Sequence, residues 1–362
     1  MKQWNRWDEE LRGKTCTLAH VGAAVVGVLN GAVYYHHPSS HRREINTDSS
    51  SEQKGLPLKD RGRVGQQLGM YRLVRLLGQN GFSEVYLGKH IFDNMPVAIK
   101  ILDGYFNQED ATRFLMQVYS LTHLEHPHIV RTLDFGVEGS MAFLVMSYAP
   151  NGTLRQRHPK GTCLSVDLVV SYVKQVASGL EYIHDQQLVH RDIKPHNMLL
   201  GPKNEVLLGD FGIAVPSYSQ NAIRAIPYDF EGTVLYAAPE QLQGKPRRSS
   251  DQYALGVVVY EWLCGACPFS GSADEVIYQH LLVPPPSFGE RGMHVSPAVE
   301  EVVLKALSKN PEQRFARVQD FATALEQASL IEQAEDTSPP FRFYAEPKRQ
   351  FMSPFPFSTK AS

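Results

Sequence analysis

Three short stretches of the sequence carry residue types suited to chemistry on phosphate groups. VAIK ends in Lys100, whose ammonium group could reach the phosphates of a nucleotide. HRDIKPHN supplies a carboxylate at Asp192, a cation at Lys194 and an amide oxygen at Asn197, and DFG supplies a second carboxylate at Asp210. Phosphoryl transfer needs positioned phosphates, a metal ion that neutralises charge and a carboxylate that orients the attacking hydroxyl. The residues predict this chemistry.

The order of the stretches makes the set specific. A fourth stretch, APE at Ala238–Glu240, follows Asp210 by about thirty residues. VAIK, DFG and APE are each short enough to occur by chance, whereas HRDIKPHN fixes many positions at once. All four in this order, at workable spacings, exclude coincidence as an explanation.

A glycine-containing stretch, LLGQNGFSEVYLGKH, departs from the usual loop that covers phosphates. Gly78 and Val85 hold the first and last places of the spacing G-x-G-x-x-G-x-V, but Asn80 and Ser83 replace two glycines. Asparagine tolerates the left-handed backbone region, and Asn80-Gly81 is a strong signal for a tight hairpin turn. We predict a loop that still folds over phosphate.

The elements around these residues predict an α+β fold with two lobes. Period-two alternation predicts strands at 71–78, 83–90, 95–103 and 142–150, and helical spacing marks 108–124. Mostly helical patterns follow at 164–186, 249–265, 272–282, 296–310 and 317–330. Strands first and helices afterwards indicate a small sheet lobe and a larger helical lobe, with a ligand cleft between them.

The two ends of the chain differ from this middle region. We divide the sequence into an N-terminal extension and flexible linker at 1–69, a folded domain at 70–330 and a Pro/Phe-rich disordered tail at 331–362. The apolar run at 15–35 is long enough to span a membrane. It leans on Gly and Ala, and its flanking basic residues would place an ATP-using domain outside the cell, so we favour a packed or loosely ordered extension.

Composition adds few constraints. Of 362 residues, 43% are hydrophobic and 20% charged, and the net charge of -2 gives no bias towards nucleic acid. Four cysteines are too few for a disulfide framework and favour a reducing cytoplasm. Cys264 and Cys267 form one C-x-x-C pair, half of a zinc site; we interpret them as structural thiols near a helix end rather than a redox pair.

The chain from about Tyr71 to Ala328 resembles the eukaryotic-type protein kinase family, in particular bacterial Ser/Thr kinases. The resemblance implies a bilobal fold, with Asp192 as catalytic base, Lys194 beside the γ-phosphate and Lys100 on the α- and β-phosphates. Asn197 and Asp210 would bind Mg2+. Further implied roles are a brace under the catalytic loop at Asp251, a buried ion pair between Glu240 and Arg314, and substrate placement near Asp192 by Thr233.

The same resemblance implies a nucleotide site for ATP. Its residues are Leu77, Gly78, Gln79, Asn80, Gly81, Phe82, Ser83, Glu84, Val85, Ala98, Lys100, Ser147, Ala149 and Leu199. The implied partners are protein substrates with Ser or Thr hydroxyls, including the chain itself between Phe211 and Thr233, with no nucleic acid.

One departure bears on activity. The family carries a glutamate that pairs with the strand lysine, and here Gln117 stands in its place. A pseudokinase that binds partners without transferring phosphate therefore stays an alternative, although Lys100, Asp192, Asn197 and Asp210 are all present. A kinase acting on small molecules is disfavoured by GTVLYAAPE, which looks like a peptide-docking element.

Overall fold

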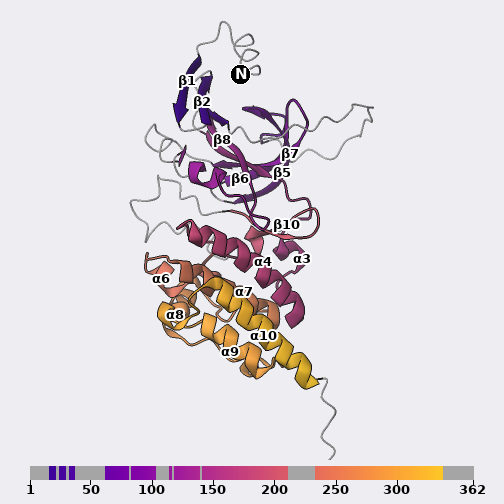
Figure 1. Cartoon of the computed structure of the whole chain (residues 1–362), viewed down its shortest axis with the longest axis vertical. Helices are drawn as coiled ribbons and strands as arrows, with labels where there is room; N and C mark the ends of the chain where they lie inside the picture. The colour runs from indigo at the N-terminus through magenta and orange to yellow at the C-terminus, as the bar shows by residue number, and fades with distance from the viewer. Residues whose placement is uncertain are drawn as a thin grey trace, which may run out of the picture.

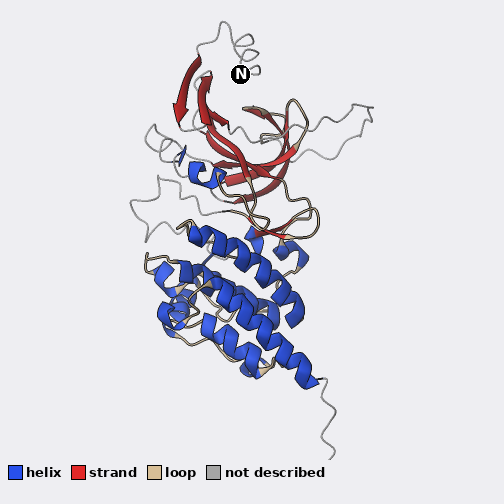
Figure 2. Ribbon diagram, viewed as in Figure 1, coloured by secondary structure: helices blue, strands red, loops and turns tan. Residues whose placement is uncertain are grey.

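The computed structural model describes residues 16–21, 24–29, 32–36, 62–80, 83–102, 114–115, 118–138, 141–210 and 233–336. Figure 1 shows a strand-rich lobe that contains the described residues up to about 147 and a helical lobe that contains the rest. Figure 2 shows that most strands lie in the first lobe and most helices in the second. The predicted α+β, two-lobed fold is confirmed.

A nine-stranded antiparallel sheet builds the first lobe, in the order β1-β2-β3-β8-β9-β7-β6-β5-β4. Its strands are β1 (Cys16–Val21), β2 (Ala24–Leu29), β3 (Ala32–His36), β4 (Gln67–Leu68), β5 (Tyr71–Asn80), β6 (Ser83–His90), β7 (Pro96–Leu102), β8 (Thr132–Glu138) and β9 (Met141–Ser147).

Alternation of apolar and polar residues explains the central strands. In β7, Val97, Ile99 and Ile101 are fully buried, while the residues between them are more exposed. Their face packs with Leu73 and Tyr86 of the neighbouring strands into one apolar cluster. The period of two sends Ala98 and Lys100 to the opposite face of the sheet, towards the second lobe.

The apolar run at 15–35 forms strands rather than a helix. β1, β2 and β3 make an antiparallel meander, and β3 pairs with β8 at Val33–Val137, Tyr34–Gly136 and Tyr35–Phe135. Two residues, Asn30 and Gly31, separate β2 from β3, which is a strong sequence signal for a hairpin. Among the described residues, no helix has the length and apolar character needed to cross a membrane.

The connection between β5 and β6 lies one residue later in the sequence than the predicted turn. Asn80 lies opposite Ser83, so the two connecting residues are Gly81 and Phe82, which lie outside the described residues. We predicted a turn centred on Asn80-Gly81. Because Asn80 pairs as the last residue of β5, its backbone belongs to the sheet.

The second lobe is built from helices. Its described elements are α3 (Leu154–Arg157), α4 (Val166–Asp185), η1 (Pro195–Asn197), β10 (Met198–Leu200), β11 (Val206–Leu208), η3 (Val234–Tyr236), α6 (Pro239–Leu242), α7 (Arg248–Cys264), α8 (Ala273–Leu282), η4 (Gly289–Arg291), α9 (Pro297–Ala306), η5 (Pro311–Gln313) and α10 (Val318–Asp336).

Helix α7 is the central support of this lobe. Every residue from Ser250 to Leu263 is buried, so the helix is covered on all sides. α4 packs against it with one apolar stripe, and α10 packs against α4. Short strands β10 and β11 pair with each other on top of α4, where they carry the residues that face the sheet lobe.

At both predicted ends of the folded domain, a strand or helix extends beyond the predicted boundary. β4 lies within the predicted linker 1–69 and pairs with β5 at Gln67–Arg72 and Leu68–Tyr71. α10 continues to Asp336, beyond the predicted start of the tail at 331. Residues 337–362 lie outside the described part of the chain, so a disordered tail stays a prediction.

Candidate active site

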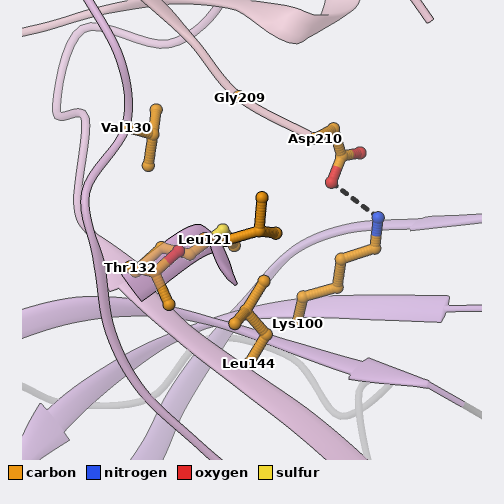
Figure 3. Close-up of a pocket in the computed structure, with 8 residues that line it drawn as sticks. Lys100, Leu121, Val130, Thr132, Leu144, Gly209 and Asp210 are labelled. Atoms are coloured by element: carbon orange, nitrogen blue, oxygen red, sulfur yellow. Dashed lines mark hydrogen bonds and ion pairs between the residues drawn. The ribbon is translucent and has the colours of Figure 1, made fainter. Parts of the chain in front are cut away.

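An ion pair joins the two lobes at the cleft. Lys100 of β7 places its Nζ 2.5 Å from Oδ1 of Asp210, which follows β11 (Figure 3). The backbone of Asp210 has φ 59, in the left-handed region. Burial opposes ionisation of Asp210, but the ammonium group of Lys100 outweighs it and lowers the pKa of this carboxyl below its ordinary value. Asp210 is therefore an anion at neutral pH.

A small pocket lies beside this ion pair (Figure 3). Apolar side chains of the sheet lobe line it next to the two charged groups, and the helical lobe contributes Gly209 and Asp210. Its lining residues are Lys100, Leu121, Val130, Thr132, Leu144, Met146, Gly209 and Asp210.

Gly209 lets the chain pass close beneath Leu199. A Cβ atom at Gly209 would lie 2.5 Å from Cδ1 of Leu199, which is far inside contact distance. A side chain at position 209 would therefore displace the end of Leu199, which packs against the apolar cluster that contains Met146.

The predicted catalytic residues converge on Asp192. Asn197 donates from Nδ2 to both the backbone oxygen and Oδ2 of Asp192, each at 2.8 Å. Lys194 Nζ lies 3.0 Å from Asp192 Oδ2 and donates to Thr233 Oγ1 at 2.9 Å. The hydroxyl of Thr233 lies 3.4 Å from Asp192 Oδ1. The predicted proximity of Thr233 to Asp192 is confirmed.

The loop that carries Asp192 is held from below by α7. Asp251 accepts from the backbone N–H groups of His190 and Arg191 at 2.9 and 2.8 Å, and its Oδ2 lies 2.8 Å from His184 Nε2. Arg191 has φ 69, a strained conformation for a long side chain. Two hydrogen bonds to a buried carboxylate fix the loop in this shape, and the predicted brace at Asp251 is confirmed.

His190 links the same loop to the segment of Asp210, a role that our sequence reasoning missed. Its side chain is fully buried, with Nε2 3.0 Å from the carbonyl oxygen of Gly209, and its Nδ1 accepts from Asp192 N–H at 3.3 Å. Burial lowers the pKa of His190, so the ring is neutral and donates through Nε2. The signal was its place at the start of HRDIKPHN.

We call residues 233–240 the substrate-side segment. A second set of residues, which we did not predict, holds this segment in place beneath Thr233. Tyr236 donates to Glu261 Oε2 at 2.6 Å, and Arg155 Nη2 contacts the hydroxyl of Tyr236 at 2.7 Å and both carboxylate oxygens of Glu261 at 2.7 and 2.8 Å. His280 Nε2 lies 3.1 Å from the carbonyl oxygen of Leu235. Side chains from three helices, α3, α7 and α8, thus hold η3 in place.

The predicted ion pair between Glu240 and Arg314 is confirmed and has a structural role. Arg314 donates from Nη1 and Nη2 to the two carboxylate oxygens at 2.8 and 2.9 Å, and Ser250 donates to Glu240 Oε1 at 2.7 Å. Burial alone would raise the pKa of Glu240. The hydrogen bonds from Arg314 and Ser250 have the larger combined effect, so the pKa is lowered below its ordinary value. The pair fixes the end of the substrate-side segment to the base of the helical lobe.

The predicted nucleotide residues fall into three groups. Val85 lies opposite Lys100 in the sheet, and Ala98 and Leu199 are half-buried beside one apolar cluster with Met146 between the lobes. Gly78, Gln79 and Glu84 lie in the β5–β6 hairpin, whereas Gly81, Phe82, Gln117 and 211–232 lie outside the described residues. Ser147 ends β9, and its backbone N–H donates to Arg131 at 2.9 Å.

The donor set suits a hard divalent cation only with help from the nucleotide. Within the described residues, no group of three or more His, Cys, Asp and Glu side chains could hold a metal ion. Asn197 and Asp210 offer oxygen ligands on adjacent segments, because Gly209 N–H donates to the carbonyl oxygen of Asn197 at 2.9 Å. Mg2+ is commonly held by one or two protein oxygens plus phosphates and water, so the residues fit.

Fold and site together define a two-lobed protein with an ion-paired cleft between its lobes. Residues 71–328 match the model of the protein kinase domain, and the chain belongs to the protein kinase family. The match covers the predicted domain at 70–330 apart from one residue at its N-terminal end and two at its C-terminal end.

Several relatives come from bacteria. The chain is 34% identical over 270 residues to Serine/threonine-protein kinase PrkC of Bacillus subtilis, covering 73% of this chain and 41% of the relative. It is 36% identical over 274 residues to Serine/threonine-protein kinase PknF of Mycobacterium tuberculosis, covering 72% and 56%. The chain therefore spans only about half the length of these relatives.

Proposed function

We propose that this chain transfers the γ-phosphoryl group of ATP to Ser and Thr hydroxyls of proteins. The observation that carries the proposal is the placement of Lys194, whose ammonium lies between the Asp192 carboxylate and the Thr233 hydroxyl. A cation at this point can neutralise charge on the transferred phosphoryl group while a carboxylate orients the attacking hydroxyl. The names of the relatives, all Ser/Thr kinases, support the same chemistry.

Asp192 would act as the group that accepts the substrate proton. One of its oxygens, Oδ2, is held by Asn197 and Lys194, while Oδ1 faces the hydroxyl of Thr233 at a longer distance. A substrate hydroxyl in the position of the Thr233 hydroxyl would meet the less occupied oxygen. General base catalysis requires such reach before it requires a matched pKa.

Magnesium is part of the proposal, with Asn197 and Asp210 as its protein ligands. The family uses ATP with a divalent metal, and bound Mg2+ would neutralise charge on the phosphates. Lys100, now paired with Asp210, would turn towards the α- and β-phosphates when a nucleotide is present. The carboxylate of Asp210 would then be available to the metal.

For the nucleotide we propose the cleft between the sheet and β10. Leu77, Gly78, Gln79, Asn80, Gly81, Phe82, Ser83 and Glu84 would cover the phosphates, and Val85, Ala98 and Leu199 would enclose the purine. Backbone groups of Ser147 and Ala149 would meet its edge. Among the described residues, no backbone carbonyl oxygen accepts a hydrogen bond from the N–H of Ala149. We place the reaction in the cytoplasm, where ATP is available.

The test is phosphate transfer by the full chain with Asp192→Asn. With labelled ATP and Mg2+, the wild type should label itself and a generic basic protein. The variant should lose turnover by about two to four orders of magnitude and keep its ATP affinity, because Asn cannot accept the proton. Asp274→Asn, on the exposed first turn of α8, is the control and should keep full activity.

Two results would replace the proposal. Nucleotide binding by the wild type without any protein labelling would favour a pseudokinase. Labelling of a metabolite alone would identify a small-molecule kinase. Equal activity of wild type and Asp192→Asn would remove Asp192 from the mechanism.

A further inference from the structure

Two cysteines from distant parts of the sequence meet on the surface of the helical lobe. Cys163 lies in the connection between α3 and α4 and is exposed, and Cys264 is the last residue of α7 and is half-buried. Two backbone hydrogen bonds join these segments around them. Gly161 N–H donates to Gly265 at 2.9 Å, and Leu164 N–H donates to Trp262 at 2.7 Å.

The thiol of Cys163 lies against the residue that follows Cys264. Gly265 ends α7 with φ 74, and a Cβ atom built on it would lie 3.2 Å from Sγ of Cys163 and 3.0 Å from the carbonyl oxygen of Gly161. Glycine at 265 thus serves two purposes: it adopts the left-handed cap, and it leaves room for the Cys163 thiol beside the helix end.

Cys267 belongs to different surroundings, although it forms a C-x-x-C with Cys264. Burial, followed by the Glu261 carboxylate, raises the pKa of Cys267 to about 12, and Tyr236 hydrogen-bonds its thiol. Burial also raises the pKa of Cys264, and Cys163 is among the neighbouring groups that raise it further. The neighbours therefore associate Cys264 with Cys163 rather than with Cys267.

We propose that Cys163 and Cys264 form a reversible disulfide when the protein meets a peroxide. Cys163, the exposed thiol, attacks one peroxide oxygen as a thiolate and breaks the O–O bond, which yields a sulfenic acid and hydroxide. Cys264, as a thiolate, then attacks the sulfenic sulfur and displaces a second hydroxide. The two thiol protons convert both hydroxides to water, so one peroxide is reduced as one dithiol is oxidised.

The disulfide would act on the substrate-side segment through α7. Gly265 N–H donates to the carbonyl oxygen of Glu261 at 2.7 Å, and the Glu261 carboxylate holds Tyr236. Oxidation one turn from Glu261 would change how firmly η3 is held, without contact to Asp192. This consequence rests on the proposed function, whereas the disulfide itself does not.

The experiment treats the full, reduced protein with hydrogen peroxide, blocks remaining thiols with an alkylating reagent and maps cross-links by mass spectrometry without reductant. We expect a peptide containing Cys163 joined to the peptide containing Cys264 and Cys267, released by dithiothreitol. Because one tryptic peptide carries both cysteines of the C-x-x-C, variants decide which one reacts. Cys267→Ala should keep the cross-link, and Cys264→Ala and Cys163→Ala should each lose it.

Absence of the cross-link in wild type, its survival in Cys264→Ala, or a bond between Cys264 and Cys267 would overturn the pair. If Cys264→Ala does not fold, Cys267→Ala tests the same point, because loss of the cross-link in that variant would make Cys267 the partner of Cys163. Kinase activity is the second readout: we expect the peroxide-treated wild type to change its KM for a protein substrate at least threefold and Cys163→Ala to stay unchanged. A disulfide with unchanged KM in an active protein would overturn only the coupling to Tyr236, and inactivity of the reduced wild type would overturn the proposed function instead.

Discussion

Lys100 and Asp210 connect the two lobes through side chains that lie 110 residues apart in the sequence, with 2.5 Å between Nζ and Oδ1. The lysine comes from the centre of the sheet and the aspartate from the segment after β11. A carboxylate that would bind a metal is thus paired with the cation that would bind phosphate. The pair keeps two half-buried charges matched, and a bound nucleotide and metal would separate them.

Removal of the carboxylate at Asp210 should uncouple nucleotide binding from magnesium. In Asp210→Ala the ion loses its main protein ligand, so we expect the Mg2+-dependent part of the ATP affinity to disappear. Isothermal titration with ATP, with and without Mg2+, measures this difference. Asp210→Asn, which keeps one oxygen, should fall between the variant and the wild type. A metal effect that survives Asp210→Ala would place the ion elsewhere.

Restoring a carboxylate at position 117 should raise activity. Gln117→Glu would add a charge-assisted contact for Lys100, and such bonds contribute about 1.5–3 kcal/mol when well formed. Since solvent would remove part of this, we expect a gain in turnover of several-fold to about tenfold. Steady-state kinetics compares it with Gln66→Glu, an exposed site in the same lobe. No gain in an active enzyme would mean that Asp210 alone positions Lys100.

The ion pair between Glu240 and Arg314 should matter for stability rather than for chemistry. The Arg314 side chain is 0% exposed, so Glu240→Ala would strand a buried charge and cost about 3–5 kcal/mol of unfolding free energy. The control is Glu312→Ala in the pair with Arg247; the side chain of Glu312 is 79% exposed and that of Arg247 is 53% exposed, so we expect about 0–1 kcal/mol there. Urea titrations give both values, and similar losses in the two variants would contradict the assignment.

His280 should make stability depend on pH. Burial, followed by the charge of Lys309, lowers the pKa of His280 to about 4, against 6.5 for the free side chain. Below pH 6.5 the imidazole of His280 binds a proton in the unfolded chain, whereas in the folded chain it binds one only near pH 4. Stability therefore falls across this window, by up to about 3 kcal/mol from this group, and the loss is absent above it.

His280→Leu provides the measurement for that window. The variant loses the contacts to Tyr253 and Leu235, so it should be less stable at pH 7, yet its stability should fall less steeply between pH 6.5 and 4. His294→Leu, at an exposed site, should leave the slope unchanged. Equal slopes in wild type and His280→Leu would show that the imidazole does not titrate as its surroundings require.

The sequence allowed more of the site than of its supports to be predicted. Asp192, Lys194, Asn197 and Asp210 sit in motifs for which the family resemblance implies roles, and Asp251 was predicted from the same resemblance. Arg155, Tyr236 and Glu261 could not be predicted, because only the tertiary fold brings three separate segments to one buried point. Patterns in a short stretch of sequence do not predict a tertiary contact of this kind.

The apolar run at 15–35 shows a different limit. Short apolar segments are ambiguous between helix and strand when read by periodicity alone. The decisive signal was Asn30-Gly31 between two valine-containing stretches, which fits a hairpin; its final partner, β8, lies about a hundred residues later and has no local signature.

That pairing of β3 with β8 has a consequence for biosynthesis. Val33 leaves the ribosome 104 residues before its partner Val137. At synthesis rates of about 5–20 residues per second, the meander waits roughly 5 to 20 s for the strand it joins. Its two hairpins can close by themselves in that interval, but β3 keeps one edge open until β8 emerges. The nascent chain thus carries an open strand edge early, in the period when chaperones would meet it.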